Sequence, residues 1–132
     1  MLRAVLDTNV FVAAGFRPAS ASAALLSAAG EGRLTLVWRP ETRDETRAVL
    51  SRIPRLDWSA VAPLFRPEGA SEAEPDLGAV AFVADPADRK FAALALAEGV
   101  PLASADRHLR AHADRLPVVA PGALLERLGG DD

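Results

Sequence analysis

Acidic residues follow three of the short apolar runs in this sequence: Asp7, Asp85 and Asp106. Each run is too short for a helix and is predicted to be a buried strand. Since the carboxyl ends of parallel strands meet at one edge of a sheet, the three carboxylates are expected to face the same edge. Burying an unpaired charge costs as much free energy as a small domain has to spare. Asp7 must therefore either cap a helix or hold a cation.

The predicted helix from Pro40 to about Arg52 carries further acids. Its most apolar stripe has the spacing of one helical face and consists of Thr42, Thr46, Val49 and Ile53. At about 100° per residue, Asp44 lies opposite this stripe and Glu41 lies well off it. These two acids are interpreted as solvated side chains at the positive end of the helix. Glu45 lies on the margin of the stripe, so it is the acid of this helix that can reach the protein side.

A second acid-bearing helix is predicted to begin with Asp85 as its N-cap and to end at Gly99. Within it, Asp88 shares a face with the apolar residues Phe91, Ala92 and Ala95. The carboxylate of Asp88 either bonds the amides of the first turn in a capping box or joins the acids at the strand ends. The sequence leaves both interpretations open.

Carboxylates that converge on one edge repel one another and raise one another's pKa. Arginine partners or a hard divalent cation would relieve this repulsion. Apart from His108 and His112, the potential ligands are oxygen atoms, because the sequence contains no cysteine. Oxygen ligands suit Mg²⁺ or Mn²⁺ rather than zinc. The matching chemistry is phosphodiester hydrolysis, in which the cation activates water and stabilises the charge that develops on the phosphate.

The composition is that of an ordinary globular protein. The 132 residues are expected to form one domain, residues 1–132, with a full core. The net charge of −3 excludes a polycation that coats nucleic acid. No apolar run approaches the ~20 residues needed to cross a bilayer, and no signal peptide is recognisable at the N-terminus, so no membrane association is expected. The lack of cysteine is compatible with a reducing cytosol, and a cytoplasmic location is expected.

Short apolar runs alternate with helical patterns along the chain. The expected strands are Ala4–Leu6, Leu34–Trp38, Val80–Val83, Pro101–Ala103 and Pro117–Val119. The other expected helices are Ser20–Ala29, Asp57–Phe65, a short helix after Asp106, and Gly122–Leu128, whereas Pro67–Gly78 is expected to be a loop. This alternation predicts an α/β fold with a parallel sheet covered by helices on both faces.

Several stretches of the sequence, in order, resemble the motifs of the PIN-domain nucleases, most closely those of VapC-type toxins. The first is VLDTNVFVAAGF, which resembles the family's first strand with its hallmark acid, here Asp7, followed by Thr8 and Asn9. The second is ETRDETRAVL, which resembles the helix that bears the second acid. Its register falls on Glu45, the residue that the helical face also singles out.

The remaining motifs extend the resemblance over nearly the whole chain. The third is DPADRKFAALALAEGV, in which the acid eleven positions before the glycine is Asp88. The fourth is PLASADRHL, in which Ser104 stands for the usual Thr or Ser and Asp106 for the acid. The closing VVAPGALLERL resembles the family's last strand and helix.

The resemblance implies a PIN-like three-layer α/β/α sandwich with a central parallel sheet of four to five strands. It implies an endoribonuclease that depends on Mg²⁺ or Mn²⁺ and hydrolyses RNA phosphodiester bonds. As a VapC-type toxin, the protein would pair with a small antitoxin and form a homodimer. A catalytically silent PIN-like module that binds RNA or protein is the alternative.

The resemblance also implies roles for individual residues. The acids expected to bind metal and carry catalysis are Asp7, Glu45, Asp88 and Asp106. Thr8 or Ser104 would hydrogen-bond the carboxylates or the substrate phosphate, and Asn9 would orient Asp7. For Thr8 and Asn9, a simple turn after the strand is an equal alternative.

Two positions depart from the pattern of the toxin subgroup. Ala87 and Arg89 interrupt the run of acids around the third motif, and His108 stands where a further Asp is usual. These departures leave the number of bound metal ions open. His108 is interpreted as a surface residue, with phosphate contact or metal ligation as its alternatives, and His112 as a surface residue without a role.

Arg39, Arg43 and Arg47 form a basic stripe beside Glu45. It is interpreted as a solvated face paired with nearby acids, with RNA steering or contact with an acidic partner as alternatives. Trp38 and Trp58 are expected in the core or at an interface.

A phosphatase of the haloacid dehalogenase type also has an acid after its first strand. That family needs a second acid two positions later, where this sequence has Asn9, and a lysine for which Lys90 is the only candidate. The phosphatase alternative is therefore disfavoured.

Overall fold

The computed structural model describes residues 1–130 and contains a four-stranded sheet in the order β2-β1-β3-β4. All strand pairs are parallel, with Leu2 opposite Leu34 and Val5 opposite Leu102. The strands are β1 (Leu2–Leu6), β2 (Leu34–Leu36), β3 (Leu102–Ala103) and β4 (Val118–Val119). The sheet is short because β3 and β4 contribute only two residues each.

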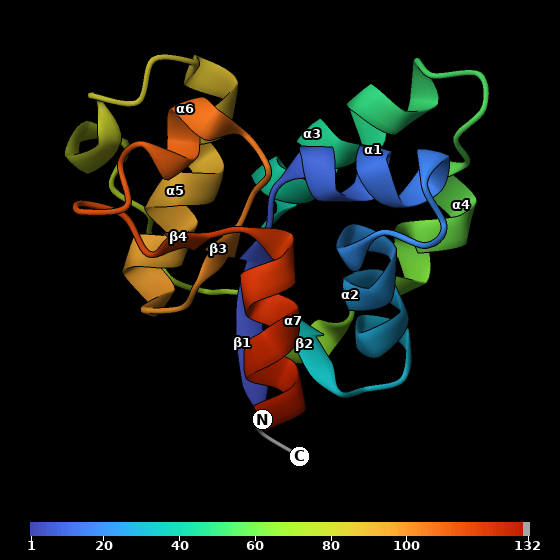
Figure 1. Ribbon diagram of the computed structural model, residues 1–132. Coiled ribbons are helices and arrows are strands. Elements are labelled where there is room, and N and C mark those ends of the chain that lie inside the picture. Colours follow the sequence, from blue (N-terminus) through green and yellow to red (C-terminus); the bar gives the residue numbers. More distant parts are fainter. Residues whose placement is uncertain (131–132) are drawn as a thin grey trace.

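Helices cover both faces of this sheet. They are α1 (Thr8–Phe16), α2 (Ala21–Gly30), α3 (Pro40–Ser51), α4 (Trp58–Val61), α5 (Pro86–Glu98), α6 (Arg107–Arg110) and α7 (Pro121–Gly130). Three 3₁₀ turns are η1 (Ala62–Leu64), η2 (Pro67–Gly69) and η3 (Leu77–Val80). Figure 1 shows α5 and α6 on one side of the strands and α1 and α2 on the other, with α7 in front of β1 and β2. The expected three-layer α/β/α arrangement with a parallel sheet is confirmed.

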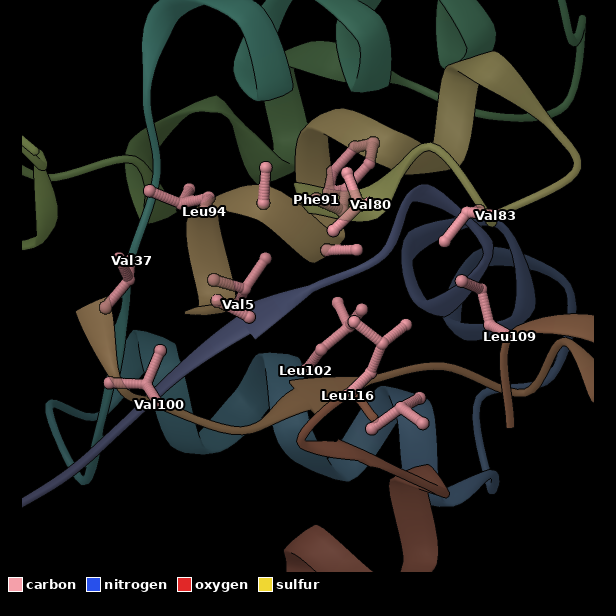
Figure 2. Packing of buried hydrophobic residues seen from close by; sticks show 14 residues of the cluster. Val5, Val37, Val80, Val83, Phe91, Leu94, Val100, Leu102, Leu109 and Leu116 are labelled. Atoms are coloured by element: carbon pink, nitrogen blue, oxygen red, sulfur yellow. The ribbon is translucent and has the colours of Figure 1, made fainter. Parts of the chain in front are cut away.

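Successive side chains of β1 point to opposite faces of the sheet, so the buried core forms two layers, one on each face. Val5 lies in one buried cluster with Leu102 and the apolar face of α5. In Figure 2, Val5 and Leu102 lie below Phe91 of α5. Leu6 points to the opposite face, where its cluster contains residues of α1, α2 and α7. Since successive strand residues point to opposite faces, burial of both faces requires the near-continuous apolar sequence of β1.

The predicted strand Val80–Val83 is wrong. Val80 ends η3, and the Val83 amide donates to the Val80 carbonyl at 2.9 Å, which closes a turn. Asp76 starts η3 by accepting a hydrogen bond from the Gly78 amide at 2.9 Å. Val80 and Val83 are buried against the α5 side of the core, so their apolar character reflects burial rather than strand pairing. Asp85 therefore does not follow a strand.

The helix α1 was not expected. Thr8 and Asn9, interpreted as orienting residues or a turn, open this helix, and Asp7 is its N-cap. The apolar residues Val10 and Phe11 are buried, so tertiary packing stabilises a segment of weak helix propensity. The expected helix Asp57–Phe65 is present as α4 followed by η1, which has Pro63 in its first turn.

The remaining helices and strands begin and end close to the predicted residues. Ser20 caps α2 through a hydrogen bond from the Ala23 amide, and Pro40 lies in the first turn of α3. Asp85 caps α5, and Gly99 ends it with a φ of 64°, a left-handed conformation that glycine adopts without steric cost.

Gly69, the last residue of η2, provides a test of how closely this turn approaches the sheet. A Cβ atom at this position would lie 1.8 Å from the Leu36 carbonyl oxygen. We expect Gly69→Ala to lower the free energy of unfolding by about 1–3 kcal/mol, because the backbone must move. Urea denaturation measures this change. Gly129→Ala in α7, where a Cβ meets no atom within 4 Å, is the control, and an equal loss of stability in both variants would contradict the explanation.

Within residues 1–130, no single helix is long and apolar enough to cross a membrane. Only when taken together are α1 and α2 long and apolar enough, and the chain bends by 104° between them.

Candidate active site

The four acids singled out in the sequence line one cavity of about 170 Å³, called the acidic pocket below; they are Asp7, Glu45, Asp88 and Asp106. Four different elements contribute them: the end of β1, α3, α5 and the loop between β3 and α6. Asp85 also lines the pocket. The fold therefore brings together all the acids that were predicted to converge.

Asp7 is the most buried of these acids, with a residue exposure of 2%. It occupies the N-cap position of α1, where no full capping hydrogen bond forms, although the backbone amides of Thr8 and Asn9 lie near its carboxylate. The Ser104 hydroxyl donates to Asp7 Oδ2 at 2.8 Å. Burial raises the pKa of Asp7, the Ser104 hydroxyl and nearby backbone amides oppose this, and the charge of Asp106 adds to the rise.

Ser104 connects the acids at two neighbouring strand ends. Its side chain is fully buried, and besides donating to Asp7 it accepts a hydrogen bond from the Asp106 amide at 3.0 Å. The Asp7 amide in turn donates to the Ala103 carbonyl at 3.0 Å. The predicted contact between Ser104 and a carboxylate is therefore present.

The side chains of Thr8 and Asn9 make no hydrogen bond to a carboxylate among the described residues, whereas their backbone amides lower the pKa of Asp7. The buried Thr8 hydroxyl instead bonds the Thr46 hydroxyl at 3.0 Å, which joins α1 to α3. Asn9 is exposed, and no hydrogen bond in the described part of the chain links its side chain to Asp7. The Thr8–Thr46 contact was not foreseen, because the two positions are 38 residues apart in the sequence.

Glu45 reaches the pocket from the margin of the buried stripe of α3, as its helical position predicts. Its Oε1 accepts a hydrogen bond from Lys90 Nζ of α5 at 2.8 Å. Both side chains are partly exposed, with 21% for Glu45 and 30% for Lys90. This partner was not foreseen, and the sequence carries one signal for it, namely that Lys90 is the chain's single lysine.

Asp88 is half-buried, and the pKa of its carboxyl group is strongly raised. Burial and then the charges of the neighbouring acids raise its pKa from 3.8 to about 7; those acids are, in decreasing order, Asp7, Asp85, Asp106 and Glu45. Asp85 caps α5, but no hydrogen bond among the described residues joins the Asp85 amide to the Asp88 carboxylate, so the capping box that was the alternative role of Asp88 is not formed.

Asp85 and Asp106 both bond backbone amides. Asp85 Oδ1 accepts from the Ala87 amide at 2.9 Å, which confirms its interpretation as an N-cap. Asp106 Oδ1 accepts from the His108 amide at 2.8 Å at the start of α6. This bond engages one carboxylate oxygen of Asp106 while the side chain still lines the acidic pocket.

The acidic pocket adjoins a larger hollow of about 350 Å³, since Asp85, Asp88 and Asp106 line both. His108 and His112 also line this larger hollow. The ring of His112, interpreted as a surface residue without a role, packs edge-on against Phe82 with centroids 4.9 Å apart.

The donor set fits a hard divalent cation by its chemistry. The side chains around the pocket offer carboxylate oxygens, and burial together with the charges of the neighbouring acids raises the pKa of Asp88 to about 7. The geometry alone does not form a cation site, because no three His, Cys, Asp or Glu side chains among residues 1–130 are arranged to hold a metal ion.

The basic stripe on α3 is largely engaged in structural contacts. Arg39 pairs with Glu41 at 2.9 Å and donates to the carbonyls of Ser71 and Ala73. Arg43 lies 5.1 Å from the centre of the Trp58 ring. This engagement favours the structural interpretation of the stripe over RNA steering for these two arginines.

The two tryptophans pack against a common partner. The rings of Trp38 and Trp58 both contact Phe65, with centroid distances of 5.9 and 5.3 Å. Both tryptophans are partly buried and pack against the core, in agreement with the core alternative of the expectation.

Comparisons with known proteins point to one family. The family model described as PIN domain matches residues 3–103. Among solved structures, the crystal structure of PAE2754 from Pyrobaculum aerophilum is similar, with a TM-score of 0.61 and 23% sequence identity over 98% of each chain. This likeness concerns the fold. A search of the curated proteins found no significant match.

Proposed function

Since this chain belongs to the PIN domain family, whose members are generally nucleases, we propose that it is an endoribonuclease that depends on Mg²⁺ or Mn²⁺. The single observation that carries the proposal is the acidic pocket, where four separate elements bring carboxylates together at the carboxyl end of the sheet. Such a concentration of negative charge is unfavourable for binding RNA unless a cation reverses the local sign.

Asp7, Asp88 and Asp106 would hold the cation, with Glu45 as a fourth acid at the pocket. When bound, Mg²⁺ or Mn²⁺ supplies a Lewis acid that activates water and stabilises the charge on the phosphodiester in the transition state. Ser104 fixes the orientation of Asp7 through its hydrogen bond to Oδ2. An acid that is preorganised in this way loses little conformational freedom when a ligand binds.

We further propose that the protein acts as the toxin of a toxin–antitoxin pair, with a small antitoxin and a second copy of the chain as partners. This rests on the resemblance of its motifs to those of VapC-type toxins. The silent alternative, a module that binds RNA or protein without cutting, is favoured by one observation: among residues 1–130, no three acidic or histidine side chains are arranged to hold a metal ion.

Cleavage of RNA by the purified protein tests the proposal. We expect a mixed single-stranded RNA pool to be cut in Mg²⁺ or Mn²⁺ and to stay intact in EDTA. The Asp44→Asn variant is a matched control, because Asp44 is an exposed acid of α3 away from the pocket. Cleavage that persists in EDTA would refute metal dependence. Binding of RNA without cleavage under any condition would favour the silent module.

A further inference from the structure

We propose that the larger hollow beside the acidic pocket binds one nucleotide of a single-stranded RNA. Arg115, held against the face of the Phe82 ring, binds a backbone phosphate of this nucleotide, and the hollow takes its base. This inference rests on the proposed function and deepens it, because it names where the RNA strand lies beside the cleavage site. It concerns Phe82, His112 and Arg115, to which the sequence motifs assign no role.

The first observation is that the guanidinium of Arg115 is held in place while its N–H groups stay free. Its Cζ lies 3.6 Å from the centre of the Phe82 ring, well within the range of a cation–π contact. No acceptor among residues 1–130 bonds its N–H groups, and no carboxylate of these residues pairs with it. By contrast, Arg66 and Arg89 donate to backbone carbonyls. An oriented guanidinium with free donors suits the bidentate binding of a phosphate.

The second observation is that Phe82 lies on a turn that is fixed from both sides. Arg89 of α5 donates to the Val83 carbonyl at 2.7 Å and to the Ala81 carbonyl at 3.3 Å. Val83 and Leu109 of α6 belong to one buried cluster and both line the hollow, and Figure 2 shows them near each other. The Phe82 ring is therefore a firm support for Arg115, and little conformational freedom is lost when a ligand binds.

His112 connects this support to the hollow. It lines the hollow, and its ring packs edge-on against the Phe82 ring. Its carbonyl accepts hydrogen bonds from the amides of Arg115 and Leu116, both at 2.8 Å, so His112 and Arg115 belong to one tight turn. A phosphate on Arg115 would therefore lie beside the hollow.

The third observation is how charge is divided around the hollow. Asp85, Asp88 and Asp106 line it, and they would repel a phosphate inside it but can accept hydrogen bonds from the N–H groups of an uncharged base. Its volume of about 350 Å³ lies in the range of small-ligand sites, about 300–1,000 Å³. The phosphate therefore belongs outside, at Arg115, and the base inside.

The chain around Arg115 is basic, which favours a polyanion. Residues 107–115 contain three arginines and one acid, Asp114, and none of these arginines forms a salt bridge within residues 1–130. A single strand with charged phosphates and uncharged bases matches both the basic segment and the acidic walls of the hollow. An acidic peptide would bring only carboxylates to these walls, so RNA is the better match.

Binding of a fluorescent single-stranded RNA of mixed sequence, followed by anisotropy in Mg²⁺ at several salt concentrations, tests the inference. All proteins carry Asp7→Asn, so that the RNA stays intact. We expect Arg115→Gln to weaken binding about fivefold and to reduce the slope of log K against log salt by about 0.7, the loss of one phosphate contact. Phe82→Leu should weaken binding but keep the slope, because the charge remains.

Arg127→Gln is the matched control, since it removes the same charge from an exposed position near the end of α7, which Figure 1 shows away from α6. It should change neither the affinity nor the slope, and circular dichroism shows whether each variant is folded. Arg115→Gln that binds RNA as tightly as its parent, or an equal loss in Arg127→Gln, would overturn the inference.

Two further probes test the class of the ligand. We expect an oligomer of abasic ribose phosphates to bind at least about fivefold more weakly than RNA of the same length. Equal binding would show that the hollow takes no base. Polyglutamate should not displace the RNA, and displacement that is lost in Arg115→Gln would indicate an acidic protein as the partner and overturn the inference.

Steady-state cleavage by chains that retain Asp7 decides the matter independently of the Asp7→Asn background. We expect Arg115→Gln to raise KM about fivefold and to leave kcat within about twofold, because the contact exists equally before and during the reaction. A lower kcat with an unchanged KM would overturn the inference. Wild-type protein that neither binds nor cleaves RNA would refute the proposed function as well, whereas metal-dependent cleavage that Arg115→Gln leaves unchanged would refute only this inference.

Discussion

Replacement of Asp7 by Asn is expected to slow RNA cleavage at least about a hundredfold while the protein stays folded. The substitution removes the most buried negative charge of the acidic pocket but preserves its shape. The Ser104 hydroxyl, which donates to Asp7 Oδ2 at 2.8 Å, can donate equally to the amide oxygen of Asn. Because burial raises the pKa of Asp7, the neutral amide costs less to bury than the carboxylate, and the melting temperature should not fall.

Single-turnover cleavage of a defined RNA in Mg²⁺, together with thermal unfolding, measures both effects. Asp44→Asn, which removes an exposed acid from α3, should cleave within about twofold of the wild-type rate. Asp7→Asn that cleaves like the wild-type protein would place the active site elsewhere. A variant that loses activity because it unfolds would be recognised by its melting curve.

Replacement of Asp88 by Asn is expected to have opposite effects on function and on stability. The pKa of Asp88 is raised from 3.8 to about 7 in the folded protein, so the folded state binds this proton more tightly than the unfolded chain. Without metal, the contribution of Asp88 to stability should therefore be greatest below pH 4, fall between about pH 4 and 7, and stay low above pH 7. Asp88→Asn removes this loss and also abolishes cleavage.

Since Asp88 is half-exposed, water screens part of the repulsion, and we expect a gain of only about 1–2 kcal/mol for Asp88→Asn at pH 8. Urea denaturation in EDTA at pH 5 and pH 8 measures this gain, which should be smaller at pH 5. Mg²⁺ should stabilise the wild-type protein at pH 8 more than the variant. If the free energy of unfolding changed equally with pH in the wild-type protein and in Asp88→Asn, the loss of stability would not come from Asp88.

The sequence predicted the parts of the site that depend on local patterns. Glu45 was recognised because helical geometry puts it on the margin of a buried stripe, and Asp85 because Asp before Pro is typical of an N-cap. Asp7 and Asp106 were recognised because burying an acid at the end of a short apolar run costs free energy unless its carboxylate caps a helix or binds a cation. These inferences need only the residues next to each acid.

The parts that were missed depend on contacts between distant residues. The Glu45–Lys90 ion pair joins positions 45 residues apart, which no local pattern reveals. Val80–Val83 was mistaken for a strand because a short apolar run does not distinguish strand pairing from burial of a turn. The helix α1 was missed because its β-branched residues and glycine disfavour a helix, whereas packing against α2, α3 and Phe65 stabilises it.

Because Lys90 is the chain's single lysine, the protein has only two primary amines, the other being at the N-terminus. In a proteolytic fragment without the N-terminus, an amine-directed reagent therefore adds a single mass increment, at Lys90 in the cavity beside the acidic pocket. Glu45 holds the Lys90 nitrogen at 2.8 Å, so the reagent reaches this nitrogen more readily when the ion pair opens. The rate at which that increment appears in mass spectrometry would follow the opening of the Glu45–Lys90 pair directly, with no label or mutation placed in the chain.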